Sequence, residues 1–474
     1  MAAADESVVP LASSPRQPAA PLAGSHRPAR DAPVRQRSLR THNLGLVLRH
    51  VATSTRPVSR ADVAAATGLT KATVSTLVDE LLAGSLLAEV DPAPRTGAGR
   101  PAVGLRLASQ GPAGLGLEIN IDYLAACVVD LTGRERHREL LRGDLRGRPA
   151  PAILDDLADL ARAAMAAATA EQLVVAGVAL AAPGLVADGV VRLAPNLDWR
   201  DLDVRAELTA RGLPEDLTVD NEANLAAVGE LHARADIDPA AARASFLYIS
   251  GEIGVGAGIV LGGELFRGAR GFGGELGHIT IRPDGVHCRC GARGCLEAYA
   301  NQEALLRYAG LTGAVRLADG DGNGGAPGSV ASLGTSGSSD TAGSTGSGDD
   351  GAVAASMLDD GGVARLAALA RAGAHPALLA LEQAGSALGV AAADVVNLLD
   401  VGLIVLGGIY APLAPWLVEP MQREINERVM AAEYAPVVVE ASLLGASATV
   451  VGAAGSVVRS IRDAPASWLE SRAT

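Results

Sequence analysis

The chain has 474 residues, a formal net charge of −13 and four cysteines. Its length predicts two or three domains, and the absence of an apolar run of about 18 residues free of charge, Pro and Gly argues against a membrane span. The acidic balance excludes a surface that binds nucleic acid throughout. Few cysteines, and a start that does not resemble a secretory leader, predict a cytoplasmic protein.

The charge is divided unevenly along the chain. Residues 1–110 carry more Lys and Arg than Asp and Glu, whereas the remainder is strongly acidic. This asymmetry predicts that only the amino-terminal part contacts nucleic acid. Within that part, residues 1–37 are rich in Ala, Pro, Ser and Arg without a periodic apolar face, which predicts a disordered tail.

Residues 38–110 predict a winged helix-turn-helix module. Apolar residues recur at helical spacing over residues 39–54, and Ser59 is placed to cap a second helix over residues 60–67. Gly68 can supply the positive φ of a tight turn, and Thr70 can cap a third helix that ends at Gly84. Two short apolar segments, 86–90 and 103–107, then flank a Pro/Gly/Arg-rich turn, as the strands of a wing do.

The third helix has the polar face of a recognition helix. Short polar side chains and a cation near its start would reach base edges and phosphates in a major groove. The candidate DNA-binding residues there are Thr70, Lys71, Thr73, Ser75 and Thr76, and Lys71 is the only lysine in the chain. Arg100, held between Gly99 and Pro101, is a candidate for a narrow minor groove. The alternative is a three-helix dimerisation module with a solvated polar face.

Residues 111–474 predict an α/β domain of alternating strands and helices. Strands are expected at 114–131 (two, with a turn at 120–123), 174–181, 246–250, 256–261 and 403–406, and helices at 152–170 and from 220–224 onward. Strands followed by Gly-rich loops place polar residues where α/β folds bind ligands. Residues 317–361 form a Gly/Ser/Asp tract that predicts a disordered surface insertion without a role in the chemistry.

One His and three Cys within a short segment predict a metal site. His278, Cys288, Cys290 and Cys295 make a complete tetrahedral set for a structural Zn²⁺, with no position left for water. The alternatives are small core cysteines with a satisfied histidine, or a disulfide. The lone Cys127 lies in an apolar stretch and is expected in the core.

The order of motifs resembles the ROK family (repressors, open reading frames and sugar kinases). The most specific part is Glu-x-Gly-His at 275–278 followed by Cys-x-Cys-Gly-x-x-Gly-Cys-x-Glu at 288–297, supported by segments 182–184, 194–197, 220–224 and 406–408. The resemblance covers residues 38 to about 460 apart from the insertion. It implies a two-lobed actin-like ATPase (ribonuclease H-like) fold with a sugar in the cleft beside the zinc. The winged module resembles the family's repressor branch, because its free-standing kinases lack it.

The resemblance also implies which residues contact the sugar. The family's sugar contacts fall on Asn196, Asn221, Glu222, Glu275, His278 and Glu297. Carboxylate, amide and imidazole groups are suited to sugar hydroxyls, and a metal on one nitrogen of His278 would orient the other. The alternative for Glu275 and Glu297 is that they are solvated loop charges.

Three departures from the family's kinases predict that no catalytic residue is present. Glu222 stands where those kinases have an Asp base, and the longer side chain misplaces the carboxylate. The stretch at 118–123 lacks the glycines of a phosphate loop and begins with Glu118, and Glu252 replaces the usual Thr of the second phosphate loop. ATP binding is therefore not expected.

We accordingly expect a sugar-responsive transcriptional repressor that binds operator DNA as a homodimer or a dimer of dimers. One alternative is an active ROK-type ATP-dependent sugar kinase that also binds DNA. Another is a ligand-free DNA-binding protein with a vestigial kinase body.

Overall fold

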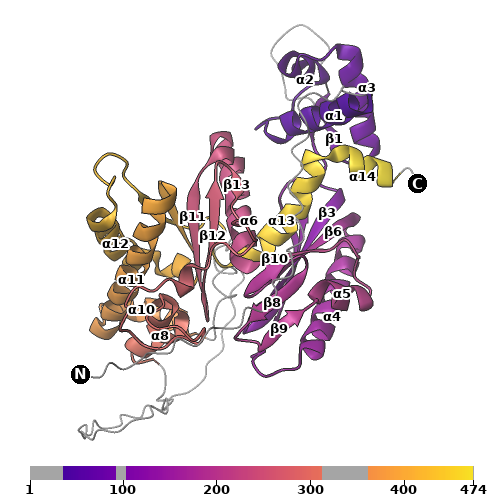
Figure 1. The fold of residues 1–474 in the computed structure, drawn as a ribbon. Helices are drawn as coiled ribbons and strands as arrows, with labels where there is room; N and C mark the ends of the chain where they lie inside the picture. Colours follow the sequence, from indigo (N-terminus) through magenta and orange to yellow (C-terminus); the bar gives the residue numbers. More distant parts are fainter. Residues whose placement is uncertain (1–35, 92–102, 312–360, 473–474) are drawn as a thin grey trace, which may run out of the picture.

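The computed structural model describes residues 36–91, 103–311 and 361–472. A small helical module stands at one end of a two-lobed body (Figure 1). The first helix begins at Gln36, so the predicted tail of residues 1–37 ends two residues earlier than expected. The rest of that tail, Arg100 and all but the last residue of the predicted insertion 317–361 lie outside the described residues.

The amino-terminal module has the predicted helices and wing. Its elements are α1 (Gln36–Ala52), α2 (Arg60–Thr67), α3 (Lys71–Ala83), β1 (Leu87–Val90) and β2 (Gly104–Leu107). Ser59 caps α2 in a capping box, Gly68 adopts a φ of 72° in the turn, and the Thr70 side chain caps α3. The two wing strands pair antiparallel. The local capping signals therefore determine where these helices begin and end.

Each lobe of the body contains one five-stranded sheet, and the two sheets share one topology. The amino-terminal lobe is ordered β10-β6-β3-β4-β5 and the carboxy-terminal lobe β15-β14-β11-β12-β13, with three consecutive antiparallel strands and two parallel ones in each. The strands of the first sheet are β3 (Gly111–Ile119), β4 (Tyr123–Asp130), β5 (Glu135–Arg142), β6 (Leu173–Ala182) and β10 (Thr218–Asn221). Those of the second are β11 (Phe246–Gly251), β12 (Val255–Leu261), β13 (Glu264–Leu265), β14 (Leu403–Gly408) and β15 (Val438–Ala441). This repeated unit confirms the predicted two-lobed α/β fold.

Helices and a small third sheet complete the lobes. The small sheet consists of β7 (Leu185–Ala187), β8 (Val190–Ala194) and β9 (Trp199–Leu202). The helices of the first lobe are α4 (Ala150–Ala170) and α5 (Val204–Ala210). Those of the second are α7 (Glu297–Ala300), α8 (Gln302–Tyr308), α10 (Gly362–Arg371), α11 (His375–Leu399) and α12 (Tyr410–Arg428). Short 3-10 turns lie at Pro239–Arg243, Leu276–His278 and Gly445–Ser447. By length and composition α11 could cross a membrane, but 67% of its apolar window is buried inside the protein.

Two helices exchange lobes and cross between them. Helix α6 (Glu222–Ile237) follows β10 of the first sheet but packs on β11 and β12 of the second. Helix α13 (Ala448–Asp463) follows β15 of the second sheet but packs on β3, β4 and β6 of the first. They meet at Gly229 and Gly452, where a Cβ on Gly452 would lie 2.0 Å from the Leu225 carbonyl oxygen. Only glycine permits backbones to approach this closely.

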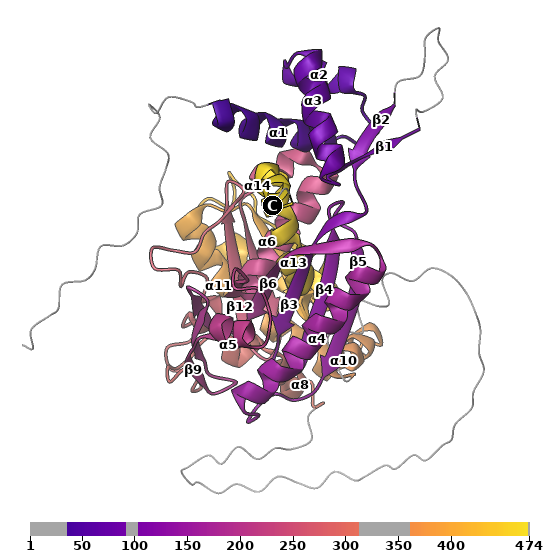
Figure 2. The same ribbon diagram turned by 90° about the vertical axis from the view of Figure 1, so that its right-hand side faces the viewer.

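The carboxy-terminal helix returns to the amino-terminal module. Helix α14 (Pro465–Ser471) packs against α1, and the two lie side by side in both views (Figures 1 and 2). One hydrophobic cluster is shared by the module, by one face of β4 and by α13, and it includes Leu48, Leu81, Cys127 and Val450. The amino-terminal module is thus joined to the body by a continuous core as well as by the chain.

Candidate functional site

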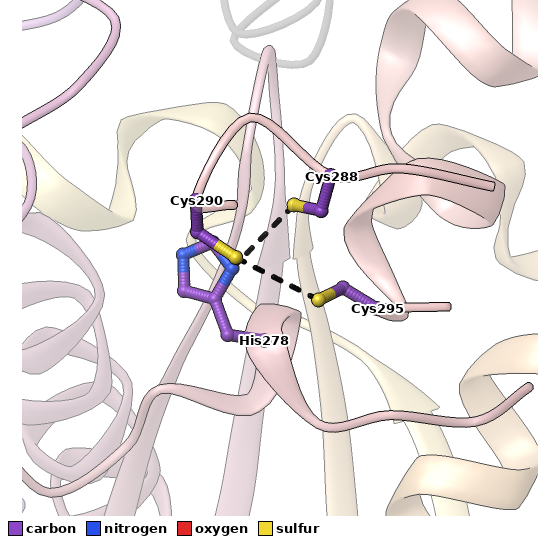
Figure 3. A group of neighbouring side chains, drawn as sticks. All are labelled: His278, Cys288, Cys290 and Cys295. Carbon is purple, nitrogen blue, oxygen red and sulfur yellow. Dashed lines mark hydrogen bonds between the residues drawn. The ribbon is translucent and has the colours of Figure 1, made fainter. Parts of the chain in front are cut away.

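The predicted metal ligands come together at the surface of the carboxy-terminal lobe. His278 ends a 3-10 turn, and the three cysteines lie in the loop that leads into α7. The ligand atoms of all four residues lie within 4.8 Å of one another. Figure 3 shows the imidazole and the three sulfur atoms gathered in one place. The structure therefore assembles the His/Cys3 cluster that the spacing predicts.

The distances within this cluster fit a tetrahedral metal site. Sγ of Cys288 lies 3.8 Å from Nδ1 of His278, and Sγ of Cys290 lies 3.7 Å from Sγ of Cys295. A tetrahedral ion with metal–sulfur bonds of about 2.3 Å separates its ligand atoms by about 3.8 Å. A disulfide would require about 2.0 Å between sulfur atoms, and all four cysteines are free. The cluster is therefore suited to a metal ion rather than to a disulfide.

The six residues carried over as sugar contacts line one pocket next to this cluster. The pocket lies between the lobes and has a volume of about 90 Å³. Its lining includes Asn196, Asn221, Glu222, Glu275, His278 and Glu297. Asn196 follows β8, Asn221 and Glu222 lie where β10 passes into α6, and the other three residues surround the metal cluster. Residues separated by about 100 positions in the sequence thus form one polar cavity.

Some of these side chains already have structural roles. Asn221 caps α6: its Oδ1 accepts from the Ala223 amide at 2.8 Å, and its Nδ2 donates to the Gly184 carbonyl oxygen at 2.9 Å. An Oε2 atom of Glu297 accepts from the Val255 amide at 3.3 Å. These contacts fix the two side chains in the pocket wall. One N–H of Asn221 and further acceptor positions on Glu297 are left for a ligand.

Three carboxyl groups, one of which lines this pocket, interact with one another: Glu118 at the end of β3, Glu222 at the start of α6 and Glu252 after β11. Burial raises the pKa of Glu118 to about 7, although the Tyr123 hydroxyl donates to its Oε1 at 2.8 Å. Burial, followed by the Glu118 and Glu275 carboxylates, raises the pKa of Glu222 to about 8. Burial and its two neighbours raise the pKa of Glu252 well above its ordinary value. Burial and mutual repulsion therefore oppose the simultaneous ionisation of these three carboxyl groups.

A side-chain hydrogen bond joins the loop after β3 to the loop after β11, the two loops in which a kinase would need phosphate-binding glycines. Asn120, after β3, donates to Glu252, after β11, and thereby connects the two lobes. The glycine pair at the end of β14 has a packing role. A Cβ on Gly407 would lie 1.8 Å from the Tyr248 hydroxyl, and Gly408 has a φ of 53°. The pair is thus explained by the fold without a nucleotide.

The candidate DNA-binding residues cluster at the start of α3. Lys71 and Thr76 are exposed, and Thr70 and Thr73 join their hydroxyl groups at 2.9 Å. The Ser75 hydroxyl instead accepts from the Arg60 guanidinium at 3.2 Å. Ser75 therefore bonds to a residue of another helix, whereas the hydroxyl groups of Thr70, Thr73 and Thr76 bond within α3 and its cap.

One polar residue of the pocket, Arg289, was not predicted from the sequence. It lies between two metal ligands, lines the pocket and donates from Nη1 to Oδ1 of Asn196 at 3.1 Å. Its place inside the Cys-x-Cys motif was the available signal, but a single variable position in a motif does not reveal what lies across the cleft. Asn120 was likewise missed, because its partner Glu252 is distant in the sequence.

Comparisons with known proteins match both the body and the amino-terminal module. A model of the ROK family matches residues 114–459, and a model of the IclR helix-turn-helix domain matches residues 44–91. The chain is 30% identical over 411 residues to a putative xylose repressor of Caldicellulosiruptor sp. (strain Rt8B.4), a match that covers 85% of this chain and 92% of that protein.

Two crystal structures resemble the fold. One is a ROK family transcriptional regulator, a homolog of the E. coli MLC protein, with a TM-score of 0.66 and 24% identity over 91% of this chain and 99% of that one. The other is a ROK family glucokinase from Streptomyces griseus in complex with glucose and AMPPNP, with a TM-score of 0.54 and 27% identity over 72% of this chain and 98% of that one. The first likeness extends over the amino-terminal module as well as the two lobes.

Proposed function

Since the chain belongs to the ROK family and carries an IclR-type helix-turn-helix at its amino-terminal end, we propose that it is a sugar-responsive transcriptional repressor. The observation that supports this proposal most is the shared hydrophobic core of the winged module, α13 and β4. A DNA-binding module held in the core of a ligand-binding body can respond to changes in that body. The similarity to a putative xylose repressor supports the repressor sense and a cytoplasmic location.

DNA recognition is assigned to the exposed start of α3. Thr70, Lys71, Thr73 and Thr76 would face base edges and phosphates of an operator, with Ser75 acting through Arg60. Arg100 remains a candidate on the wing. A homodimer, or a dimer of dimers, would present two such helices to two half-sites one helical turn apart.

The effector is assigned to the pocket between the lobes. A sugar or sugar derivative would place its hydroxyl groups against Asn196, Asn221, Glu222, Glu275, His278 and Glu297. Because the pocket walls come from both lobes, a bound sugar would favour one lobe arrangement over another. The sugar alters operator affinity only by its differential affinity for the two arrangements.

A structural Zn²⁺ is assigned to His278, Cys288, Cys290 and Cys295. When bound through Nδ1 of His278, the ion would fix the ring orientation and leave Nε2 for a sugar hydroxyl. The set supplies four ligands and so leaves no open coordination position for catalysis. Its role would be to preorganise one wall of the pocket.

The body is proposed to bind its sugar without phosphorylating it. The supporting observations are the Asn120–Glu252 hydrogen bond between the two loops and the absence of glycine at residues 118–123, where a phosphate loop would need it. Ionisation of Glu252 about 4 Å from a phosphate charge would cost on the order of 4 kcal/mol at an effective dielectric constant near 20, and the protonated side chain that burial favours already accepts a hydrogen bond from Asn120. ATP is therefore not expected to bind.

The repressor proposal is tested with purified, zinc-loaded protein. DNA selected from a random library should yield a symmetric motif, and a sugar panel should contain a member that changes the affinity for that motif. A ligand at about 100 times its dissociation constant should also add about 2.7 kcal/mol to the free energy of unfolding. Absence of sequence-specific binding at moderate salt would refute the proposal. Specific binding without a response to any sugar would support a DNA-binding protein with a vestigial body.

An ATP-dependent sugar kinase that also binds DNA is the second candidate, favoured by the likeness to the glucokinase structure. A steady-state assay with Mg-ATP and the same sugar panel separates the two. Turnover near 1 s⁻¹ or above, a typical enzyme value, would establish the kinase.

A further inference from the structure

Arg289 lines the pocket and connects its two lobes. It extends from the metal-binding loop of the carboxy-terminal lobe, and its Nη1 donates to Oδ1 of Asn196 in the other lobe at 3.1 Å. Its Nη2 donates to both carboxylate oxygens of Glu303, at 3.2 and 3.0 Å. The Arg289 side chain is 53% exposed and the Glu303 side chain 41% exposed, so both are accessible to solvent.

Arg289 is the only arginine or lysine among the residues that line this pocket, all of which belong to the described part of the chain. Three carboxyl groups line it as well, those of Glu222, Glu275 and Glu297. The single positive charge that a negatively charged ligand could meet is already paired with Glu303. The pocket therefore offers an anion no uncompensated arginine or lysine.

We propose that the Arg289–Glu303 ion pair makes this pocket selective for uncharged sugars and against sugars that carry a phosphate or carboxylate group. This inference rests on the proposal that the pocket binds a sugar at all. Glu303 is then a specificity-determining residue, although it does not line the pocket itself. It acts by neutralising the arginine that does.

The two ligand classes differ in what they must displace. A sugar hydroxyl can accept a hydrogen bond from a remaining N–H of Arg289 while the pair with Glu303 persists, because a guanidinium has five N–H groups. A phosphate or carboxylate would gain from Arg289 only by replacing Glu303 as its partner. The displaced carboxylate would then remain beside the bound anion.

Glu303 is also held from a second side. Nη1 of Arg146, in the amino-terminal lobe, donates to Oε1 of Glu303 at 3.4 Å, and Arg146 is itself paired with Asp144 at 2.9 Å. Glu303 thus lies between two arginines from opposite lobes. This arrangement opposes rotation of its carboxylate away from Arg289.

The substitution Glu303→Gln tests the proposal, because it keeps the side-chain shape and removes the charge. The matched control is Asp144→Asn, which changes the net charge equally and contacts Arg146 but not Arg289. The probes are two pairs of related compounds, glucose with glucose 6-phosphate and glucose with glucuronate, together with xylose. Affinities are measured by calorimetry on full-length, zinc-loaded protein, with zinc content and thermal unfolding recorded for each variant.

The unsubstituted protein should bind an uncharged sugar more tightly than its charged relative. Glu303→Gln should shift the ratio of the two affinities toward the anion by about fivefold, the factor that corresponds to one exposed ion pair near the upper end of its usual strength. Asp144→Asn should leave the ratio within twofold.

Three outcomes would overturn the inference: tighter binding of the phosphate or uronate by the unsubstituted protein, an unchanged ratio in a folded Glu303→Gln variant, or an equal shift in Asp144→Asn. Failure of the unsubstituted protein to bind any of these sugars or any member of a wider panel would instead remove the proposed function on which the inference rests. If Glu303→Gln does not fold, Arg289→Gln provides the opposite comparison. It removes the only arginine of the pocket lining and leaves the Glu303 charge in place, so the affinity ratio should move further toward the uncharged sugar, and a move toward the anion would overturn the inference.

Discussion

Trp468 donates its indole N–H to the carbonyl oxygen of Gly84 at 2.9 Å. This bond joins the carboxy-terminal helix to the residue that ends the predicted recognition helix. Leu469 packs at the same place, where a Cβ on Gly84 would lie 2.1 Å from one of its methyl groups. The last helix of the chain therefore supports the position of α3.

Trp468→Ala should loosen the amino-terminal module without unfolding the lobes. The loss of one hydrogen bond and of the packing of a partly buried indole is expected to cost on the order of 2 kcal/mol. Hydrogen exchange should accelerate in α1–α3 and remain unchanged in β11 and β12. Trp468→Phe, which keeps most of the packing, should show about half the effect. Equal acceleration of hydrogen exchange in the amino-terminal module and in the lobes would contradict this local role.

Lys71→Ala should weaken DNA binding about equally for specific and nonspecific sequences. Lys71 is exposed at the first position of α3 and forms no ion pair with another of the described residues. Loss of one phosphate contact should reduce the slope of log affinity against log salt by about 1. Lys71→Arg should retain the slope. Fluorescence anisotropy over a salt series measures both, and an unchanged slope for Lys71→Ala would place Lys71 away from the backbone.

Loss of the metal should impair sugar binding more than DNA binding. Cys290→Ser removes one ligand of the cluster, so His278 and Glu297 lose their fixed positions. Sugar affinity is expected to fall about 10- to 100-fold. Calorimetry and zinc analysis give the readouts. Cys127→Ala, which removes the buried thiol outside the cluster, should leave both the zinc content and sugar affinity unchanged. Zinc-independent sugar affinity would exclude the proposed preorganisation.

Glu118 should make the protein less stable as pH rises. Its pKa is about 7 in the folded chain against an ordinary value of 4.5, mainly because of burial. Between these values the folded state retains a proton that the unfolded state has released, so the free energy of unfolding decreases with pH. The full effect is on the order of 3 kcal/mol for one carboxyl group.

Urea unfolding at saturating zinc, from pH 4.5 to 8, measures this effect. Glu118→Gln should remove part of the decrease, with the remainder due to Glu222 and Glu252. Tyr123→Phe removes a hydrogen-bond donor that favours the Glu118 carboxylate, and should move the midpoint to higher pH. Parallel curves for the protein and for Glu118→Gln would show that this carboxyl group is not the source.

The features that were predictable from the sequence depend on local patterns. Ser59, Gly68 and Thr70 determine the helix boundaries of the amino-terminal module through contacts within a few residues. The four metal ligands were identifiable because ligand type and short spacing together define a site of this kind. Alternation of strands and Gly loops was sufficient for the α/β assignment.

The features that were not predictable depend on contacts between distant segments. Nothing near Trp468 indicates that it meets Gly84, and nothing near Glu303 indicates that it pairs with Arg289. The Asn120–Glu252 bond between the lobes has the same origin. Sequence patterns report which face of an element is buried, but the identity of the partner across a cleft follows only from the assembled fold.

The crossing of α6 and α13 restricts the ways in which the two lobes can move. At Gly229 and Gly452 the two helices touch through their backbones, so they have no side chains to slide past and no space to approach further. We therefore expect the lobes to move relative to each other by rotation about this contact. Because α14 follows α13 and packs against α1, a small rotation about this contact would displace the amino-terminal module. An alanine at Gly229 or at Gly452 would push the two helices apart and should hinder this rotation.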